Sequence, residues 1–316
     1  MSGPDLTCDE PGLSGLDSPH ASVDLSLLQD RRVLDNMLRL QSTMLPTDEY
    51  LYSPSSDIKP AMRKVVTNWM LEVCDEQRCE DQVFLVAVNL LDRFLNTTAV
   101  KRSQLQLSAC VCLLLASKLR QCSYLSVELL AYYTDNCVTS QEVIQWEILV
   151  VAKLKWDLCP VTAIDFVEVI LQQIPVPVDV TGVRRHASTF IALAATESEF
   201  ICQRPSCVAG AAIVAAIQGL THASRSDLEK CIEIIANMLK SRSEIIKPLL
   251  FALEASVKRA SSPSDGSVFG NSPTGATSAK HQEQYSKLRA MMDQSEEMVD
   301  TDGKETPVDI LDVPNW

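Results

Sequence analysis

The chain has 316 residues, 46% of them hydrophobic and 22% charged, and its formal net charge is −13. An acidic chain with only short basic pairs lacks the positive surface that sequence-independent nucleic-acid binding needs, so we expect no nucleic-acid partner. The longest apolar run, Cys110 to Ala116, is far shorter than a membrane span, so we expect no membrane insertion. The N-terminus shows no secretory signal, which predicts a cytosolic or nuclear protein whose thiols stay reduced.

Composition favours an all-α fold. Aromatic residues make up only 5% of the chain, so the core must be aliphatic, and only ten residues are glycine. No Asn-Gly or Asp-Gly pair separates two alternating apolar runs, as it would in a β-hairpin. The length favours two domains.

The first segment, residues 1–27, is rich in Ser, Pro, Gly and Asp and shows no periodicity, so we expect it to be disordered. Apolar residues then recur at helical spacing from Leu27 to Gln41 and predict one amphipathic helix. A polar connector containing Pro46 and Pro54 follows this helix.

Five helices are predicted next. The third reads as small and apolar on all sides, which is typical of a buried central helix. The fifth opens with Thr139-Ser-Gln-Glu142, a capping box, and Asp81 is a suitable N-cap for the second. The five ranges are Met62 to Gln77, Asp81 to Asn96, Ser103 to Leu119, Ser126 to Tyr133, and Thr139 to Leu154.

The helix that begins at Met62 carries an unusually wide apolar stripe, which includes Trp69 and ends at Val73. Its members follow the i, i+3, i+4, i+7 spacing of one helical face. Such a helix either seals a core or offers part of its face to a partner, and the stripe alone leaves both interpretations open.

A second set of five helices is predicted after Pro160. Its third helix, Val208 to Ile217, is again small and apolar on all sides, and Ser226-Asp-Leu-Glu229 fits a second capping box. Two sets with a central third helix indicate a duplicated domain. The predicted ranges are Thr162 to Gln173, Val180 to Glu199, Ser206 to Leu220, Ser226 to Leu239, and Ser243 to Val257. The predicted divisions are 1–27, 28–160, 161–257 and a disordered acidic tail, 258–316.

The sequence offers no catalytic or cofactor site. It contains neither GxxxxGK[ST] nor GxGxxG, so nothing predicts a phosphate-binding loop. The eleven cysteines include no CxxC pair and the four histidines are scattered, which argues against a metal site. We therefore expect a non-enzyme without metal or cofactor.

Several motifs, in the order in which they follow one another along the chain, resemble the cyclin family over roughly residues 30–255. They are Met62-Arg-Lys-Val-Val-x-x-Trp-Met-Leu-Glu-Val, Leu90-Leu-Asp-Arg-Phe-Leu95, Leu115-Ala-Ser-Lys118, Lys153-Leu-Lys-Trp156 and Arg185-His-Ala-x-Thr-Phe. Details such as Tyr133-Thr-Asp-Asn136 are most similar to D-type cyclins. The resemblance implies two tandem five-helix cyclin boxes and a regulatory subunit that activates a cyclin-dependent kinase of the 4/6 class at the G1/S transition.

Lys118 and Glu147 match the Lys and Glu that cyclins direct at the kinase, although without the resemblance they read as ordinary helix-end and solvated residues. Two long polar groups beside an apolar face can hydrogen-bond the backbone of a docked helix. Gln121 stands where cyclins usually carry Glu, so a charge-assisted contact to the kinase is lost. Tyr124 replaces a Pro usual in D-type cyclins. Apolar contacts to the kinase are predicted from Leu119, Leu149, Val151 and Leu154.

The resemblance also implies that the apolar stripe on the helix that begins at Met62 has two parts, one in a peptide-binding groove and one in the core. Residues that match the cyclin groove for substrate peptides and for kinase-inhibitor proteins of the Cip/Kip type are Met62, Val66, Trp69, Glu72 and Gln106. Val65, Met70 and Val73 are then expected in the core.

Two short motifs lie in the predicted tails. Leu6, Cys8 and Glu10 form an LxCxE sequence, which D-type cyclins use at this place to dock on retinoblastoma-family pocket proteins. Thr306-Pro307 resembles the phosphorylation site that marks D-type cyclins for export and destruction. Because a phosphate adds about −1.5 to −2 charges to an acidic tail, we expect a basic pocket on a ubiquitin ligase to read it. Shuttling between nucleus and cytoplasm is implied.

Two alternatives remain at the level of sequence. A cyclin-fold transcription factor of the TFIIB type would need a basic second domain and would not need LxCxE, so composition argues against it. A cyclin-fold scaffold that binds kinase without activating it is compatible with Gln121.

Overall fold

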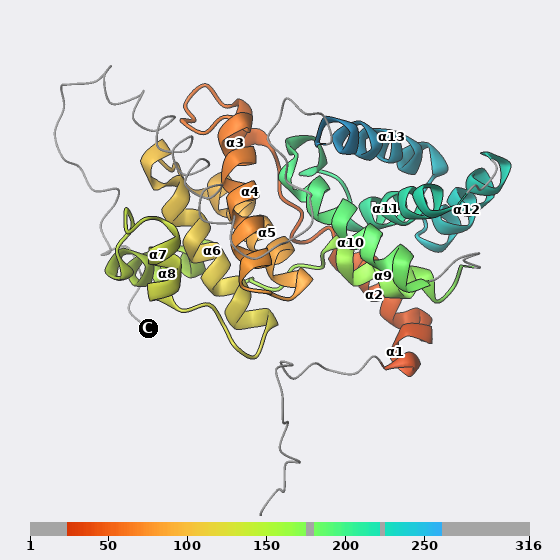
Figure 1. The fold of residues 1–316 in the computed structure, drawn as a ribbon, viewed down its shortest axis with the longest axis horizontal. Coiled ribbons are helices and arrows are strands. Elements are labelled where there is room, and N and C mark those ends of the chain that lie inside the picture. The colour runs from red at the N-terminus through yellow and green to blue at the C-terminus, as the bar shows by residue number, and fades with distance from the viewer. Residues whose placement is uncertain (1–23, 175–179, 222–224, 261–316) are drawn as a thin grey trace, which may run out of the picture.

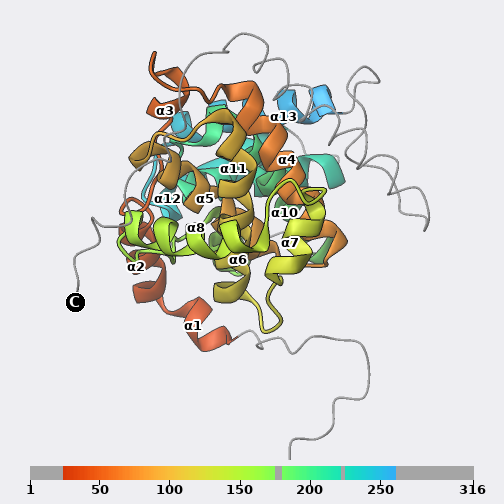
Figure 2. The ribbon, with the colours of Figure 1, turned by 90° about the vertical axis from the view of Figure 1, so that its left-hand side faces the viewer.

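A computed structural model describes residues 24–174, 180–221 and 225–260, and within these ranges every regular element is a helix. The all-α prediction is confirmed. Two bundles, one around α6 and one around α11, lie side by side in Figure 1, and in Figure 2 the bundle around α6 faces the viewer. The candidate motifs at Leu6, Cys8, Glu10 and Thr306, and the two tails predicted to be disordered, lie largely outside the described residues.

The first bundle is built around α6 (Leu105–Arg120), as predicted. Every residue of α6 from Leu105 to Ser117 is buried. Because most of its side chains are small or aliphatic, four helices can pack against it, and its charged residues, Lys118 and Arg120, come in its last turn. The surrounding helices are α4 (Pro60–Glu76), α5 (Asp81–Thr97), α7 (Val127–Tyr133) and α8 (Ser140–Lys153).

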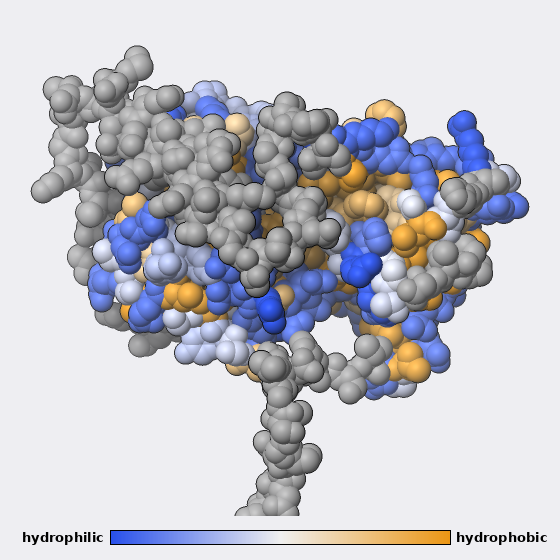
Figure 3. Space-filling model, in the orientation of Figure 1, coloured by the Kyte–Doolittle hydropathy of each residue, from blue (hydrophilic) through white to orange (hydrophobic). Residues whose placement is uncertain are grey.

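The second bundle repeats this plan around α11 (Pro205–Leu220), which is buried from Ser206 to Ile217. Gly210 lets α12 approach closely, because an added Cβ would lie 2.8 Å from Ile235 Cγ2. The surrounding helices are α9 (Ala163–Leu171), α10 (Val180–Thr196), α12 (Arg225–Met238) and α13 (Ser243–Ala260). Apolar residues are more visible around this bundle than on the shown part of the first (Figure 3).

The N-terminal region differs from the prediction of one helix from Leu27 to Gln41. The helix is divided into α1 (Leu25–Gln29) and α2 (Arg31–Leu40), because Asp30 accepts a hydrogen bond from Arg32 N and acts as a new N-cap. Structure therefore begins before residue 27, the predicted end of disorder. A short helix in the predicted connector, α3 (Glu49–Tyr52), places Tyr50 beside α5.

Two predicted N-caps are misplaced. Asp81 is the first residue of α5 and Glu80 occupies the N-cap position. Ser226 lies inside α12, which begins at Arg225, so it is not the N-cap of a capping box. The predicted box at Thr139 is confirmed, because Glu142 N donates to Thr139 Oγ1 at 3.2 Å and Thr139 N donates to Glu142 Oε2 at 2.8 Å.

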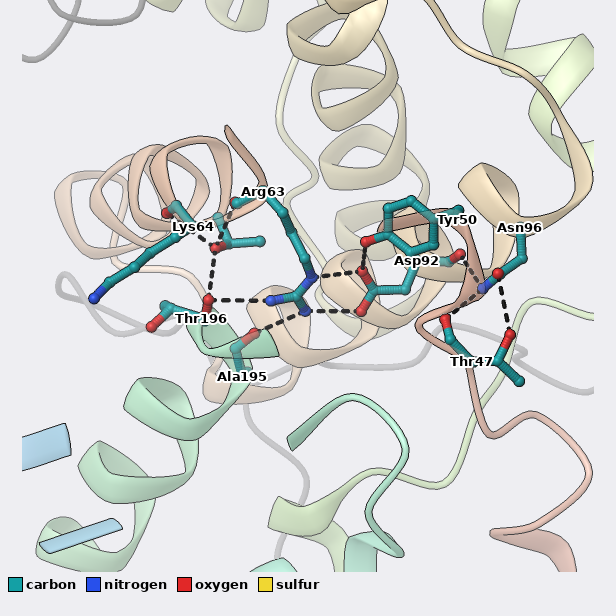
Figure 4. A network of polar contacts seen from close by, with 9 residues as sticks. Thr47, Tyr50, Arg63, Lys64, Asp92, Asn96, Ala195 and Thr196 are labelled. Atoms are coloured by element: carbon teal, nitrogen blue, oxygen red, sulfur yellow. Dashed lines mark hydrogen bonds and ion pairs between the residues drawn. The ribbon is translucent and has the colours of Figure 1, made fainter. Parts of the chain in front are cut away.

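A buried charge cluster joins the two bundles (Figure 4). Arg63 of α4 donates through Nε and Nη2 to the two carboxylate oxygens of Asp92, at 2.7 and 2.8 Å. Its Nη1 and Nη2 also donate to the carbonyls of Thr196 and Ala195 in the last turn of α10, each at 3.0 Å. Tyr50 donates its hydroxyl to Asp92 at 2.7 Å. Arg63 thus pairs two of the carbonyls that the end of α10 leaves without an intrahelical partner.

Neither Arg63 nor Asp92 was singled out by pattern, although the signal was present. Each is a charged residue with apolar neighbours at helical spacing, and such residues are buried only when they are paired. Burial lowers the pKa of Arg63, but the charge of Asp92 and its hydrogen bonds outweigh this effect and raise it. The cluster fixes the first bundle against α10 and so fixes how α4, α5 and α6 are presented.

Candidate functional site

The predicted pair Lys118 and Glu147 is brought together by α6 and α8. Lys118 Nζ donates to Glu147 Oε1 at 2.6 Å. Their side chains are 38% and 22% exposed, so the pair lies at the surface but is partly covered. Lys118 belongs to the last turn of the buried α6, and the capping box at Thr139 fixes the start of α8. Two rigid helices therefore hold the pair.

Apolar side chains next to this pair reach the solvent. Leu119 is 40% exposed, Tyr124 57%, Ile144 46% and Ile148 67%. Lys118 Nζ also lies 5.8 Å from the centroid of the Tyr124 ring. Large apolar side chains beside a partly covered ion pair are typical of a protein-binding surface. We call Lys118, Leu119, Tyr124, Ile144, Glu147 and Ile148 the α6–α8 surface.

Two of the predicted apolar contacts are placed elsewhere. Val151 and Leu154 are only 7% and 4% exposed and pack in the core of the first bundle, so they cannot touch a docked partner without moving. Leu149 is half-buried against the same core. The exposed apolar residues of α8 that the sequence analysis did not name are Ile144 and Ile148, whose i, i+4 spacing was the available signal.

Gln121, the departure from the expected Glu, is held by the turn between α4 and α5. Its Oε1 accepts a hydrogen bond from Glu80 N at 3.4 Å, and its Nε2 donates to Ser123 O at 2.6 Å. The side chain is half-buried. Gln121 therefore connects the end of α6 to a neighbouring turn and does not extend freely toward a partner.

The predicted groove on α4 is more deeply covered than expected. Val66 and Trp69 are 0% and 2% exposed, and Gln106 is 6% exposed. Met62 and Glu72 are half-exposed, and so is Val65, which had been expected in the core. Met70 and Val73 are buried as expected. The reason is that α4 is covered by α5 and α6 on one side and by α10 on another, and the sequence pattern took account of the first bundle only.

The described residues carry no group of three or more His, Cys, Asp or Glu side chains placed to hold a metal ion. Among the same residues, no helix is both long and apolar enough to cross a membrane.

Comparison with known proteins adds two kinds of match. The family model for the cyclin N-terminal domain matches residues 32–159, and that for the cyclin C-terminal domain matches residues 161–263. The chain is 41% identical to human G1/S-specific cyclin-D3 over 265 residues, which are 83% of this chain and 90% of that protein. It is 47% identical to Xenopus laevis G1/S-specific cyclin-D2 over 201 residues, covering 63% and 69% of the two chains.

A further relative and one solved structure agree with these matches. The chain is 42% identical to dog (Canis lupus familiaris) G1/S-specific cyclin-D1 over 251 residues, covering 76% of this chain and 84% of that protein. The X-ray structure of a viral cyclin from herpesvirus saimiri superimposes with a TM-score of 0.62 at 25% identity, covering 72% of this chain and 97% of the viral one.

Proposed function

The chain belongs to the cyclin family, and we propose that it binds and activates a cyclin-dependent kinase of the 4/6 class and directs it to retinoblastoma-family proteins. The coarser function follows from the family itself: the protein is a cell-cycle regulator of a cyclin-dependent kinase and not an enzyme. The finer proposal would place its action at the G1/S transition.

The observation that carries the proposal is the α6–α8 surface. Lys118 and Glu147 satisfy each other in the free protein, and both retain lone pairs or protons for the backbone of a docked kinase helix. Ile148 and Leu119 would bury their exposed apolar area against that helix. Trp156, 79% exposed at the end of α8, adds an aromatic residue of the type that contributes most to binding energy.

We extend the proposal to the other partners. Leu6, Cys8 and Glu10 would dock as an extended peptide on the retinoblastoma pocket. Met62, Glu72 and the half-exposed Val65 would form the accessible part of a groove for substrates and Cip/Kip-type inhibitors. Phosphorylated Thr306 would be read by a ubiquitin ligase, and the protein would shuttle between nucleus and cytoplasm.

The deciding experiment mixes the purified chain with a 4/6-class kinase phosphorylated on its activation loop. Both the affinity of the complex and the phosphorylation of a retinoblastoma C-terminal fragment are measured. Tight binding together with stimulated phosphorylation supports the proposal. Binding without stimulation would instead identify a scaffold, the second candidate function, which is favoured by Gln121 because its side chain is engaged within the chain.

Variants separate the two docking surfaces. Ile148→Ser should weaken kinase binding, whereas Ile234→Ser, at a 42% exposed isoleucine of α12, is the matched control and should not. Cys8→Ala should leave the kinase complex intact and reduce recruitment of the pocket protein. Pocket-protein binding that is insensitive to Cys8→Ala would show that LxCxE is not the docking motif.

A further inference from the structure

The end of α4 brings two cysteines together. Cys79 N donates to Cys74 O at 2.9 Å, and Arg78 N donates to Asp75 O at 3.2 Å. Arg78, between them, has a positive φ of 50°. These features define a Schellman motif, in which the third-last helical residue and the second residue after the C-cap come into side-chain contact. Those two positions are Cys74 and Cys79.

The same motif also ends α7, α8 and α12, where residues with positive φ follow each helix. The residues that correspond to Cys74 and Cys79 are Ala131 with Asn136, Val151 with Trp156, and Ala236 with Ser241. Among these four helix ends, only that of α4 carries two cysteines. At α4 the ordinary geometry of the Schellman motif therefore brings two thiols together. The interaction between the two side chains shifts the pKa of each thiol.

The two thiols are not equivalent. The hydrogen bond with Cys74 lowers the pKa of Cys79; partial burial opposes this, and a hydrogen bond with Gln121 lowers it further. The hydrogen bond with Cys79, followed by burial, raises the pKa of Cys74. A half-buried thiol with a lowered pKa next to a buried thiol with a raised pKa resembles the attacking and resolving cysteines of a redox pair.

A small oxidant can reach this pair. Both cysteines line a cavity of about 380 Å³ between the α4–α5 turn and α10. Arg184 and Arg185 of α10 lie on its opposite wall, while Asp75 and Glu80 lie next to the thiols. The cavity is large enough for hydrogen peroxide, which is uncharged and so is not excluded by the acidic side chains.

We propose that Cys74 and Cys79 form a redox-sensitive pair that hydrogen peroxide converts to a disulfide across the end of α4. The Cys79 thiolate attacks one peroxide oxygen, the O–O bond breaks, and the leaving hydroxide takes a proton to become water. Cys74 then attacks the Cys79 sulfenic acid, forming the S–S bond while the S–O bond breaks and a second water leaves. Two thiols and one peroxide give one disulfide and two waters, and two glutathione thiols reverse the reaction.

Oxidation would affect the α6–α8 surface through Gln121. In the reduced protein Gln121 accepts a hydrogen bond from the backbone N–H of Glu80, the residue after Cys79, and its interaction with Cys79 lowers the pKa of that thiol. Disulfide formation moves the Cys79 sulfur toward Cys74, and we expect this to weaken the hydrogen bonding that holds Gln121. Resting on the proposed function, we expect the oxidised chain to bind the kinase about two- to tenfold more weakly, as the loss of one hydrogen bond implies.

The test treats the full reduced chain with equimolar hydrogen peroxide, removes the oxidant, alkylates the remaining thiols and digests with trypsin. Because Arg78 lies between the two cysteines, cleavage separates them into the peptides 65–78 and 79–93, each with one cysteine. The expected product is these two peptides joined, lighter by two hydrogens. Recovery of both cysteines alkylated while the exposed Cys137 is oxidised would overturn the proposal.

Three variants complete the test, each checked by thermal unfolding. Cys79→Ser should abolish the joined peptides, and Cys74→Ser should leave a sulfenic acid on Cys79 that dimedone traps. Cys137→Ser, at an exposed cysteine between α7 and α8, is the control and should still give them. Kinase affinity is then compared before and after oxidation. Equal affinities would refute the proposed effect of oxidation on kinase binding through Gln121. The joined peptides are detected without kinase, so the disulfide can be tested even if the proposed function fails.

Discussion

Two ion pairs of similar chemistry have different surroundings in this protein. Arg63 and Asp92 are 1% and 2% exposed, and they lie where the two bundles meet. Lys118 and Glu147 are 38% and 22% exposed, and they lie among apolar side chains that reach the solvent. The first pair has all its partners within the chain, namely Tyr50 and two carbonyls of α10, whereas the second has hydrogen-bonding capacity left for another molecule.

The difference teaches that burial decides what an ion pair does. Breaking a buried pair leaves an unpaired charge in a poorly solvated site, and the protein loses stability. Breaking a partly exposed pair costs little stability because water solvates the remaining charge. That same pair can contribute to binding once a partner removes the water. Stability should therefore depend on Arg63, and partner binding on Lys118.

The largest expected effect is on Arg63→Met. Removing the guanidinium leaves the Asp92 carboxylate buried without its cation and takes a donor from the Ala195 and Thr196 carbonyls, so the free energy of unfolding should fall by about 3–5 kcal/mol. Urea denaturation measures this loss. Arg32→Met, at an arginine paired on the surface with Asp30, is the control and should show no measurable change. A small loss for Arg63→Met would show that burial does not set the importance of the pair.

The next effect concerns binding. Lys118→Ala should weaken the complex with the kinase by about 1–3 kcal/mol, because a backbone group of the docked helix is left without its partner. Its effect on unfolding should stay below about 1 kcal/mol. Arg259→Ala, which breaks the comparably exposed pair with Glu199, should not affect binding. Calorimetric titration measures the free energy of kinase binding, and urea denaturation measures the free energy of unfolding. If Lys118→Ala lowered both by the same amount, the Lys118–Glu147 pair would not differ from the Arg63–Asp92 pair in the way we expect.

A third test uses pH. Burial, followed by the negative charge of Asp92, raises the pKa of Tyr50 above its ordinary value of 10.0. In the unfolded chain Tyr50 loses its proton near pH 10 while the folded protein keeps it, so the folded state binds more protons and stability falls as pH rises above 10. The limiting slope is about 1.4 kcal/mol per pH unit. Tyr50→Phe should flatten this fall, and the exposed Tyr52→Phe should not.

The smallest expected effect comes from an intermediate pair at the same junction. Lys64 Nζ lies 3.0 Å from Glu197 Oε1, and the two side chains are 40% and 11% exposed. Lys64→Ala should lower the free energy of unfolding by about 0.5–1 kcal/mol, between the values for the buried and the surface pairs. Lys247→Ala on α13, an exposed lysine, provides the baseline in the same urea series. A loss as large as that of Arg63→Met would break the expected order.

Much of the fold could be predicted, because helical periodicity and capping are local properties. The central positions of α6 and α11 followed from their apolar composition, and Thr139 marked the start of α8. The division at Asp30 was missed, because a capping aspartate inside a helical pattern competes with continuation of the helix, and periodicity does not decide between them.

The candidate site was predicted less evenly. Lys118 and Glu147 were chosen by resemblance and do lie in contact. Val151 and Leu154 were assigned to the surface, but they face the core, since a residue on an amphipathic helix can be assigned to a face only when the position of that face is known. Ile144 and Ile148 show where the solvent side of α8 is.

By itself, the sequence determined the helices, the two repeated bundles and the family, because these depend on residue type and on spacing along the chain. Only the tertiary structure decided which charges are buried and which remain available. Arg63 and Lys118 are both basic residues in helices, and nothing in their residue type separates them. The packing of α10 against α4 covers the first and leaves the second exposed, and that contact joins residues 133 positions apart in the chain, as the Arg63–Thr196 hydrogen bond shows.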